Sequence, residues 1–434
     1  MVSWSFLAVS LWGAWFTWNA YRPTYRPAPF AALSFFAGWL TVELAVHHIA
    51  WQLAATFAFA WAGAFLAWPG RIGFAITLVS WAALYRCQAR AREAAIVMEE
   101  ALTAALGPDY RDAVPADLRE RLETEVDWRR LVMPFRMRHP EVTRVRNVEY
   151  ARVGKTPLLL DVYHHRDRPE GCPVLLQIHG GAWVVGSKDE QGQPLMQHLA
   201  SRGWVCVSIN YRLSPRATFP DPIIDVKRAI AWIREHGARY GADPSFLVVT
   251  GGSAGGHLCA LAALTGNDPD YQPGFEHVDT AVDGCVSFYG VYDFTDRHGQ
   301  YRNRGLARLL ERRVMKVPMA TARDAYEKAS PMSRVSEQAP PFLVVHGDRD
   351  TLVPVDEARH FVATLRGRTK APVAYAEIPG AQHAFEIFPS LRTALVVHGV
   401  ERFLTYLYGR ARGARRPPTE TEHGAAARSA SIAR

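Results

Sequence analysis

The chain has 434 residues, of which 49% are hydrophobic and 21% are charged, and this composition is that of a globular protein with a large buried core. Its net charge of +8 comes mostly from arginine, but the basic residues form no nucleic-acid-binding motif and do not interleave with aromatic residues, which excludes nucleic acid as a partner. The five cysteines have neither CxxC nor Cys/His spacing, which argues against a metal site and favours buried, reduced thiols in a reducing compartment.

Residues 1–86 are predicted to anchor the protein in a membrane. Nine of the 13 tryptophans precede Tyr85, and Glu43 is the only formally charged side chain between Pro27 and Arg71. The apolar stretches cover residues 3–21, 30–46, 49–68 and 72–85. A span needs about 20 apolar residues, and continuous apolarity without a polar face suits lipid better than a buried soluble helical domain. We expect three or four transmembrane helices, or two with an interfacial segment, and the lipid bilayer as a partner.

Ionisable residues interrupt the second apolar stretch. Glu43 and His47 are four residues apart and would share a helix face, and ionisable groups at membrane depth are functional candidates. This pair is the only support for a transporter or sensor, and we favour an interfacial turn between two spans. We expect a multi-pass protein of the cell membrane. Arginines just after the last stretch favour a catalytic domain on the cytoplasmic side of the membrane, although four simple crossings cannot place every arginine-bearing loop on the cytoplasmic side. These arginines are Arg86, Arg90 and Arg92, and the loop arginines are Arg22, Arg26 and Arg71.

Residues 87–144 are predicted to form a helical connector that could also contribute to a lid. The sequence CQARAREAAIVMEEALTAALG, residues 87–107, has helical spacing and ends at a Gly-Pro stop. A second, charged helix is predicted over about residues 115–131.

Residues 145–408 alternate apolar strand-like runs with helical patterns. The runs are LLLDVYH, PVLLQIHG, WVCVSINY, FLVVTGG, GCVSFYG, PFLVVHG and PVAYAEI. This alternation predicts an α/β catalytic domain with a mainly parallel sheet, covered by helices on both faces. The segment of residues 292–333 is long, rich in basic residues and partly helical in its pattern, and it is a candidate lid insertion. The tail, residues 409–434, has no apolar period and is expected to be disordered.

The candidate nucleophile is Ser253, in the sequence GGSAG at residues 251–255. It lies directly after the strand-like FLVVT and before the helical HLCALAAL, which is the context of a nucleophile on a sharp strand-to-helix turn. Such a turn strains the serine backbone, and small neighbours let it close. A phosphate-binding loop is disfavoured because GxxxxGK[ST] and GxGxxG are both missing.

A serine needs a base, and a base needs an orienting carboxylate. His383 in PGAQHAFE follows the last strand, and HGDRDTLVP supplies two carboxylates just after the strand PFLVV. The chain order serine, acid, histidine is that expected for this fold. Asp350 is the predicted triad acid because the pattern GxxD before an apolar-Pro pair fits the acid position of this fold. Asp348 is the alternative and is otherwise expected to have a turn or capping role.

The loop QIHGGAW, residues 177–183, is the candidate oxyanion loop. Its glycines let backbone N–H groups face a substrate without side-chain interference. Gly181, Ala182 and Ala254 are the predicted donors, Gly180 is a substitute, and Trp183 is the candidate substrate-binding residue. Tyr211 and Arg212 in NYRLSP are expected to be scaffold residues below the pocket.

Several separate motifs together resemble the α/β-hydrolase superfamily, over about residues 145–408. They are HGGAW, SINYRLSPRATFPDPIIDVKRAIAWI, GADPSFLVVTGGSAGGHLCALAAL and HGDRDTLVP. The similar groups are the hormone-sensitive-lipase-like and feruloyl-esterase-like carboxylesterases, and the apolar N-terminus resembles the membrane-associated actinobacterial lipase/esterase subgroup. The resemblance implies hydrolysis of a small-molecule or lipid ester through an acyl-enzyme, without metal or organic cofactor.

The chain departs from the hormone-sensitive-lipase-like pattern in three places. Gly252 stands where GDSAG has aspartate, Ala182 stands at the third glycine of HGGG, and HGDRDTLVP differs from the DPLxD-type acid motif. These departures affect substrate class more than chemistry, so deacetylase, amidase, formamidase and peptidase activities stay open, as does the oligomeric state. The complete triad and oxyanion loop disfavour a non-catalytic scaffold protein.

Overall fold

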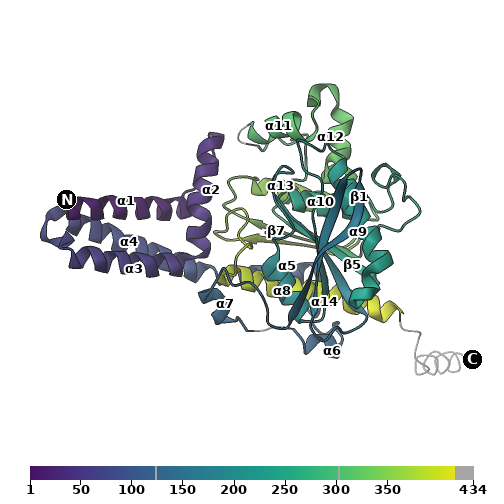
Figure 1. Cartoon of the computed structure of the whole chain (residues 1–434), viewed down its shortest axis with the longest axis horizontal. Coiled ribbons are helices and arrows are strands. Elements are labelled where there is room, and N and C mark those ends of the chain that lie inside the picture. The colour runs from purple at the N-terminus through teal and green to yellow at the C-terminus, as the bar shows by residue number, and fades with distance from the viewer. Residues whose placement is uncertain (123–124, 302–303, 416–434) are drawn as a thin grey trace, which may run out of the picture.

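The computed structural model describes residues 1–122, 125–301 and 304–415. Figure 1 shows an α/β domain from which a narrow helical arm projects, with the N-terminus at the far tip of the arm. The arm consists of α1 Val2–Tyr21, α3 Ala45–Trp61, α4 Trp68–Arg90 and, lying across its base beside the α/β domain, α2 Ala28–Glu43 (Figure 1).

The sheet has the strand order β1-β2-β4-β3-β5-β6-β7-β8. Its strands are β1 Val142–Val153, β2 Thr156–His165, β3 Cys172–Ile178, β4 Val205–Ile209, β5 Ala242–Gly252, β6 Gly284–Phe288, β7 Phe342–Gly347 and β8 Val373–Ile378. Strand β2 pairs antiparallel with β1 and β4, and the other neighbours are parallel. The predicted mainly parallel α/β sheet is confirmed. Strand β1 was not predicted because it is an edge strand rich in charged, half-exposed residues.

Helices cover both faces of the sheet. One face carries α9 Asp221–His236, α10 Ala254–Leu264 and α13 Val355–Arg366, and the other carries α5 Glu93–Leu106, α8 Gln193–Ser201 and α14 Leu391–Arg415. Alternate strand residues enter the two cores, so Val174 and Leu176 of β3 join the first and Leu175 joins the second. Strand β5 and helix α10 are mostly buried, and this burial fixes the position of the turn that joins them.

The connector differs from its prediction in two places. The single helix expected over residues 87–107 breaks after Arg90, and α5 packs between β8 and α14 as part of the catalytic domain. The helix expected over residues 115–131 is replaced by the short α6 Ala116–Arg119 and α7 Trp128–Val132. Neither short helix has a buried residue, so no apolar face stabilises a longer one.

The last helix, α14, continues through Gly409 to Arg415, where disorder was predicted. It is held by packing and by charge, because a Cβ at Gly409 would lie 2.6 Å from Pro115 and Arg412 pairs with Asp117 at 2.7 Å. The rest of the predicted disordered tail, residues 416–434, lies outside the described residues.

The apolar stretches of residues 1–86 are mostly helical, but the predicted set of separate transmembrane helices is not supported. Within the described ranges, no helix alone combines the length and hydropathy of a span. The segments Pro29–Glu43 and Ala45–Trp61 reach that length and composition together, with a bend of 91° between them. The bend falls at Leu44, so Glu43 and His47 lie on different helices and do not share a helix face as predicted.

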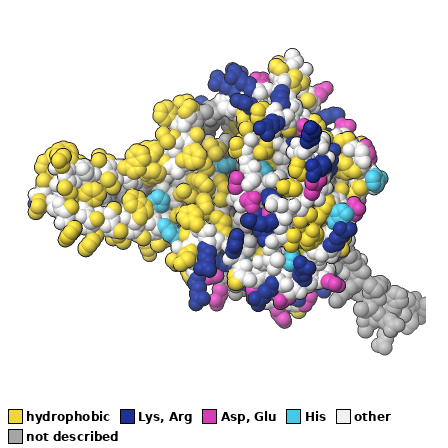
Figure 2. All heavy atoms as spheres, in the orientation of Figure 1, with side chains coloured by type: hydrophobic (Ala, Val, Ile, Leu, Met, Phe, Trp, Pro, Cys, Tyr) yellow, Lys and Arg dark blue, Asp and Glu magenta, His cyan; other side chains and the backbone are white. Residues whose placement is uncertain are grey.

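The arm buries many polar side chains beside apolar ones such as Phe6 and Leu84, and it exposes large apolar side chains. The buried polar set includes Ser10, Thr17, Gln52, Thr56, Thr77 and Ser80, whereas the exposed set includes Trp4, Trp12, Trp18, Phe57, Trp61 and Val79. Figure 2 shows the resulting continuous hydrophobic surface along the arm. Soluble domains rarely expose such a surface.

Candidate active site

Ser253 occupies the turn between β5 and α10, as predicted. Its backbone has φ of 59° and ψ of −119°, which is the strained conformation expected of a nucleophile on such a turn. The neighbouring glycines are required by close packing, because a Cβ at Gly255 would lie 2.1 Å from the carbonyl oxygen of Ile178. The side chain of Ser253 is half-buried.

Tyr289 fills the space that the absent side chain of Gly252 leaves. A Cβ on Gly252 would lie 2.6 Å from the Tyr289 hydroxyl. The Tyr289 ring lies 4.5 Å from the ring of His383, and its hydroxyl donates to the buried carboxyl of Glu386. Burial raises the pKa of Glu386 to about 7, although the hydrogen bond from Tyr289 opposes this shift. Sequence reasoning missed this tyrosine–carboxyl pair, and the glycine at position 252 was the signal that could have pointed to it.

His383 lies beside Asp350, with Nδ1 of the imidazole 2.6 Å from Oδ2 of the carboxylate. A carboxylate only accepts hydrogen bonds, so Nδ1 carries the proton and Nε2 is left to accept one. Both side chains are buried. This is the orientation that a histidine needs in order to act as a general base.

Asp350 and Asp348 have different environments. Asp350 also accepts hydrogen bonds from the backbone N–H groups of Leu352 and Val353, both at 2.8 Å. Burial by itself would raise its pKa, but His383 and a second buried histidine, His346, hold the pKa of Asp350 below its usual value.

Asp348 instead accepts from the backbone N–H of Gly380 at 2.7 Å, and burial raises its pKa. It therefore supports the turn before His383, which agrees with the structural role expected for it.

The structure brings Ser253 and His383 to the same site but does not join them. Among the described residues, no hydrogen bond connects the Ser253 hydroxyl to the imidazole. Tyr289 links their surroundings, because it contacts both Gly252 and His383. Hydrogen bonds between a nucleophile and its base are often long without substrate and shorten when substrate binds.

The predicted oxyanion loop approaches the nucleophile from β3. A Cβ at Gly180 would lie 3.2 Å from the Ser253 Cβ, so the two turns are in close contact. Gly181 and Ala182 both have positive φ, at 110° and 54°. Within residues 125–301, their N–H groups have no acceptor. The N–H of Gly180 donates to Gln191 at 2.6 Å, which leaves Gly180 poorly suited as a substitute oxyanion donor.

Trp183 is not placed to bind substrate, and this corrects the prediction. Its side chain is only 1% exposed, its indole N–H donates to His257 at 3.2 Å, and its ring packs on Phe294. The scaffold roles expected for Tyr211 and Arg212 agree with their contacts. The Tyr211 hydroxyl donates to the carbonyl of His179 at 3.0 Å, and Arg212 pairs with acidic residues of α9, Asp221 and Asp225.

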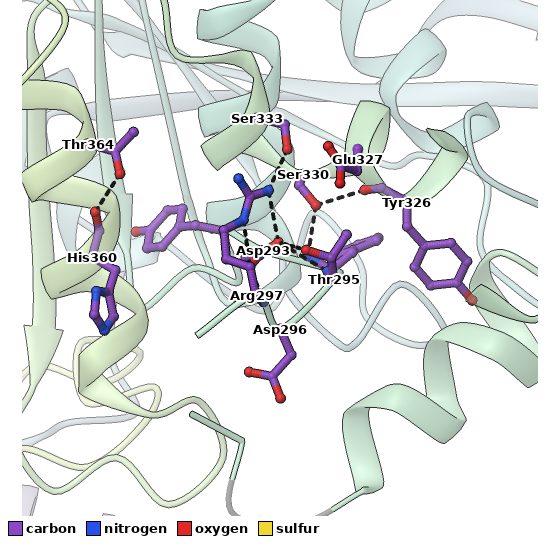
Figure 3. A network of polar contacts seen from close by, with 12 residues as sticks. Asp293, Thr295, Asp296, Arg297, Tyr326, Glu327, Ser330, Ser333, His360 and Thr364 are labelled. Atoms are coloured by element: carbon purple, nitrogen blue, oxygen red, sulfur yellow. Dashed lines mark hydrogen bonds and ion pairs between the residues drawn. The ribbon is translucent and has the colours of Figure 1, made fainter. Parts of the chain in front are cut away.

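The candidate lid insertion, residues 292–333, contains α11 Gly305–Leu309 and α12 Arg323–Ala329. Figure 3 shows the polar network at its base, in which Arg297 from its start, bonded to Asp293, donates to Ser333 from its end. The backbone N–H of Phe294 likewise donates to Ser330 at 2.9 Å. Arg297 bonds to Asp293 at 3.0 Å and to Ser333 at 2.5 Å. The two ends are therefore fixed to each other, and the helices between them project from the domain (Figure 1).

Within the described ranges, no group of three or more His, Cys, Asp or Glu side chains could hold a metal ion. The five cysteines are free and buried, as predicted.

Comparisons with known proteins identify similar chains. Residues 160–365 match the family model BD-FAE. The chain is 42% identical to the probable carboxylic ester hydrolase LipM of Mycobacterium tuberculosis, over 90% of both chains, and 41% identical to esterase LipQ of the same organism, over 89% of this chain and 87% of that one. A truncated carbohydrate esterase from gut microbiota has a similar fold, with a TM-score of 0.52 and 25% identity over 61% of this chain and 96% of its own.

Proposed function

Because this chain belongs to the carboxylic ester hydrolases of the α/β-hydrolase superfamily, we propose that Ser253, His383 and Asp350 form its catalytic triad. The observation that carries the proposal is the 2.6 Å contact between His383 and Asp350 at the site of the strained Ser253 turn. A buried imidazole with its Nδ1 fixed by a carboxylate has one nitrogen available for proton transfer.

The proposed reaction begins when Nε2 of His383 removes the Ser253 proton and Oγ attacks the ester carbonyl carbon. The carbonyl oxygen becomes an oxyanion, which the N–H groups of Gly181, Ala182 and Ala254 stabilise. The protonated His383 then gives its proton to the leaving alcohol as the carbon–oxygen bond breaks, which leaves an acyl-serine. A water molecule, deprotonated by the same imidazole, then attacks the acyl carbon. The imidazolium returns this proton to Oγ of Ser253 as the acyl–Oγ bond breaks, which releases the carboxylic acid and restores the serine hydroxyl.

The test is hydrolysis of p-nitrophenyl esters from acetyl to long acyl chains by the full-length protein, compared with Ser253→Ala. Wild-type activity that the variant lacks supports the triad, and the preferred chain length separates an esterase from a lipase. Activity that survives in Ser253→Ala would overturn the assignment of the nucleophile. Hydrolysis of amides in place of esters would favour the deacetylase, amidase or formamidase alternative.

We also propose that the arm inserts into a lipid bilayer. Its outward tryptophan and phenylalanine side chains and the polar residues in its interior support this, because helices in lipid pack through small and polar residues and present apolar residues to the acyl chains. The proposal concerns the arm as one unit and not four separate spans.

Flotation of the full-length protein with liposomes tests this proposal. The wild type is expected to rise with the lipid, and a Trp12→Lys, Phe57→Lys variant is expected to bind less because both sites face outward. Glu235→Lys is the control, since it adds the same side chain at an exposed site on α9. A wild type that stays in the lipid-free fraction would contradict the proposal.

A further inference from the structure

One face of α2 contacts the loops that carry the proposed acid and base. Ala31, Phe35, Trp39 and Glu43 follow one another at four-residue spacing and therefore lie along one side of the helix. Each of the four meets a segment of the catalytic domain more than 300 positions later in the chain. In order, they reach the loop after β7 that carries Asp350 (the acid loop, residues 348–354), the loop after β8 that carries His383 (the histidine loop, residues 379–390) and the start of α14.

The centre of this face is Trp39, which binds the residue next to the catalytic histidine. Its indole N–H donates to the carbonyl oxygen of Ala384 at 2.8 Å. Its ring stacks on Phe35 with 5.2 Å between centroids, and Phe35 lies edge-on to His383 at 6.1 Å. Phe388, further along the histidine loop, also packs on the indole, with 5.7 Å between ring centroids.

Ala384 has a strained backbone. Its φ is 59°, in the left-handed region that residues with a Cβ rarely adopt. Such a conformation persists only where the surrounding structure holds it. The bond from Trp39 holds the carbonyl of the Ala384–Phe385 peptide and so restrains the backbone directly after His383.

The ends of the same helix face are fixed as well. The Thr351 hydroxyl, next to the proposed acid Asp350, donates to the carbonyl of Ala31 at 3.2 Å. At the other end, Glu43 pairs with Arg392 and accepts a hydrogen bond from Ser390 at 2.7 Å. The position of Trp39 relative to His383 is therefore set at both ends of α2.

We propose that Trp39 is a positioning residue for His383, so that α2 of the N-terminal region completes the active site. This inference depends on the proposed triad, because Trp39 acts through the loop of the proposed base. Loss of the indole donor frees the Ala384 peptide unit, and the imidazole is then less often in line with Ser253. Proton transfer slows, whereas the surfaces that bind the ester stay in place.

The test uses Trp39→Phe in the full-length protein, which keeps an aromatic ring but removes the N–H donor. The matched control is Trp81→Phe, because Trp81 is also a partly buried arm residue whose indole N–H makes one hydrogen bond, to Gln52 at 3.0 Å. On a p-nitrophenyl ester, Trp39→Phe is expected to lower kcat about tenfold, within the loss of up to about 10²-fold that misplacing a reacting group causes. KM is expected to change less than about twofold, and Trp81→Phe is expected to leave both constants near wild type.

A second variant tests the strain at Ala384 directly. Glycine adopts positive φ without a Cβ penalty, so Ala384→Gly reduces the need for an external hydrogen bond. The loss in kcat from Trp39→Phe is therefore expected to be smaller in the Ala384→Gly background than in the wild type. A merely structural role for the tryptophan would give the same loss in both backgrounds.

The outcomes separate this inference from the proposed function. If Ser253→Ala abolishes activity but Trp39→Phe behaves like Trp81→Phe, the positioning role is wrong and the triad stands. A rise in KM with unchanged kcat would also overturn it, because Trp39 would then act in substrate binding. If Ser253→Ala keeps its activity, the proposed function itself fails.

Discussion

Breaking the buried ion pair between Glu43 and Arg392 is expected to weaken the attachment of the arm strongly. Both side chains are only 1% exposed, and the guanidinium has few other partners, with one contact to the carbonyl of Pro379 at 3.4 Å and no hydrogen bond from its Nε to any described residue. Removing one member of such a pair leaves a buried charge without its counter-charge, which costs about 3–5 kcal/mol.

The prediction concerns Glu43→Leu, Arg392→Met and the double variant. Each single variant is expected to lower the free energy of unfolding by about 3–5 kcal/mol. For a domain of this size each kcal/mol shifts Tm by about 2–4 °C, so the expected fall in Tm is about 6–20 °C. The double variant is expected to be more stable than either single variant, because it leaves no unpaired charge and replaces the pair with apolar side chains of similar volume.

Thermal unfolding of the full-length proteins in detergent measures these differences. Arg359→Met is the control, since Arg359 pairs with Glu377 at the surface and an exposed pair contributes at most about 1 kcal/mol. A double variant whose loss equals the sum of the two single losses would refute the reasoning, because the residues would then contribute independently.

Three further predictions concern the active site. Asp350→Asn is expected to lower kcat by about 10⁴-fold because the imidazole loses its correct tautomer, whereas Asp348→Asn is expected to have a much smaller effect, and p-nitrophenyl ester kinetics of both variants decides between the two acids. Gly252→Ala is expected to destabilise the protein by about 1–3 kcal/mol, measured by Tm, because its methyl group would collide with Tyr289. The raised pKa of Glu386, about 7 against 4.5, means that the folded state holds a proton that the unfolded state releases, so its contribution favours folding at low pH and is lost between pH 4.5 and 7. Urea unfolding at pH 5 and pH 8 is therefore expected to show a smaller loss of stability with pH for Glu386→Gln than for the wild type.

The sequence predicted the features of this protein that local patterns encode. Seven apolar runs matched strands, and the chain order of Ser253, Asp350 and His383 identified residues that the fold gathers at the carboxyl ends of β5, β7 and β8. The choice of Asp350 over Asp348 rested on motif spacing, and the contact with His383 agrees with it.

Contacts between distant segments were not predictable in the same way. Tyr289 and Glu386 are nearly 100 residues apart in the sequence. They meet only because Tyr289 follows β6 and Glu386 lies in the loop after β8, at the same edge of the sheet. Trp183 was assigned to substrate by its place in the motif, but its large apolar ring is stabilised more by burial against Phe294 than by exposure in a pocket. The edge strand β1 lacks the apolar run by which the other strands were recognised.

In the N-terminal region, structural contacts account for two ionisable residues that the sequence alone left as functional candidates. In the sequence, Glu43 and His47 were the only support for a transporter or sensor. In the structure Glu43 is neutralised by Arg392, and Nε2 of His47 lies 3.1 Å from the carbonyl oxygen of Val132, so each has a partner in a later segment of the chain. A charged residue that pairs across an interface needs no role in transport, because its counter-charge gives it a structural role there. The same helix face that carries Glu43 also carries Trp39, so the arm is attached to the catalytic domain at the place where it can act on the base of the proposed triad.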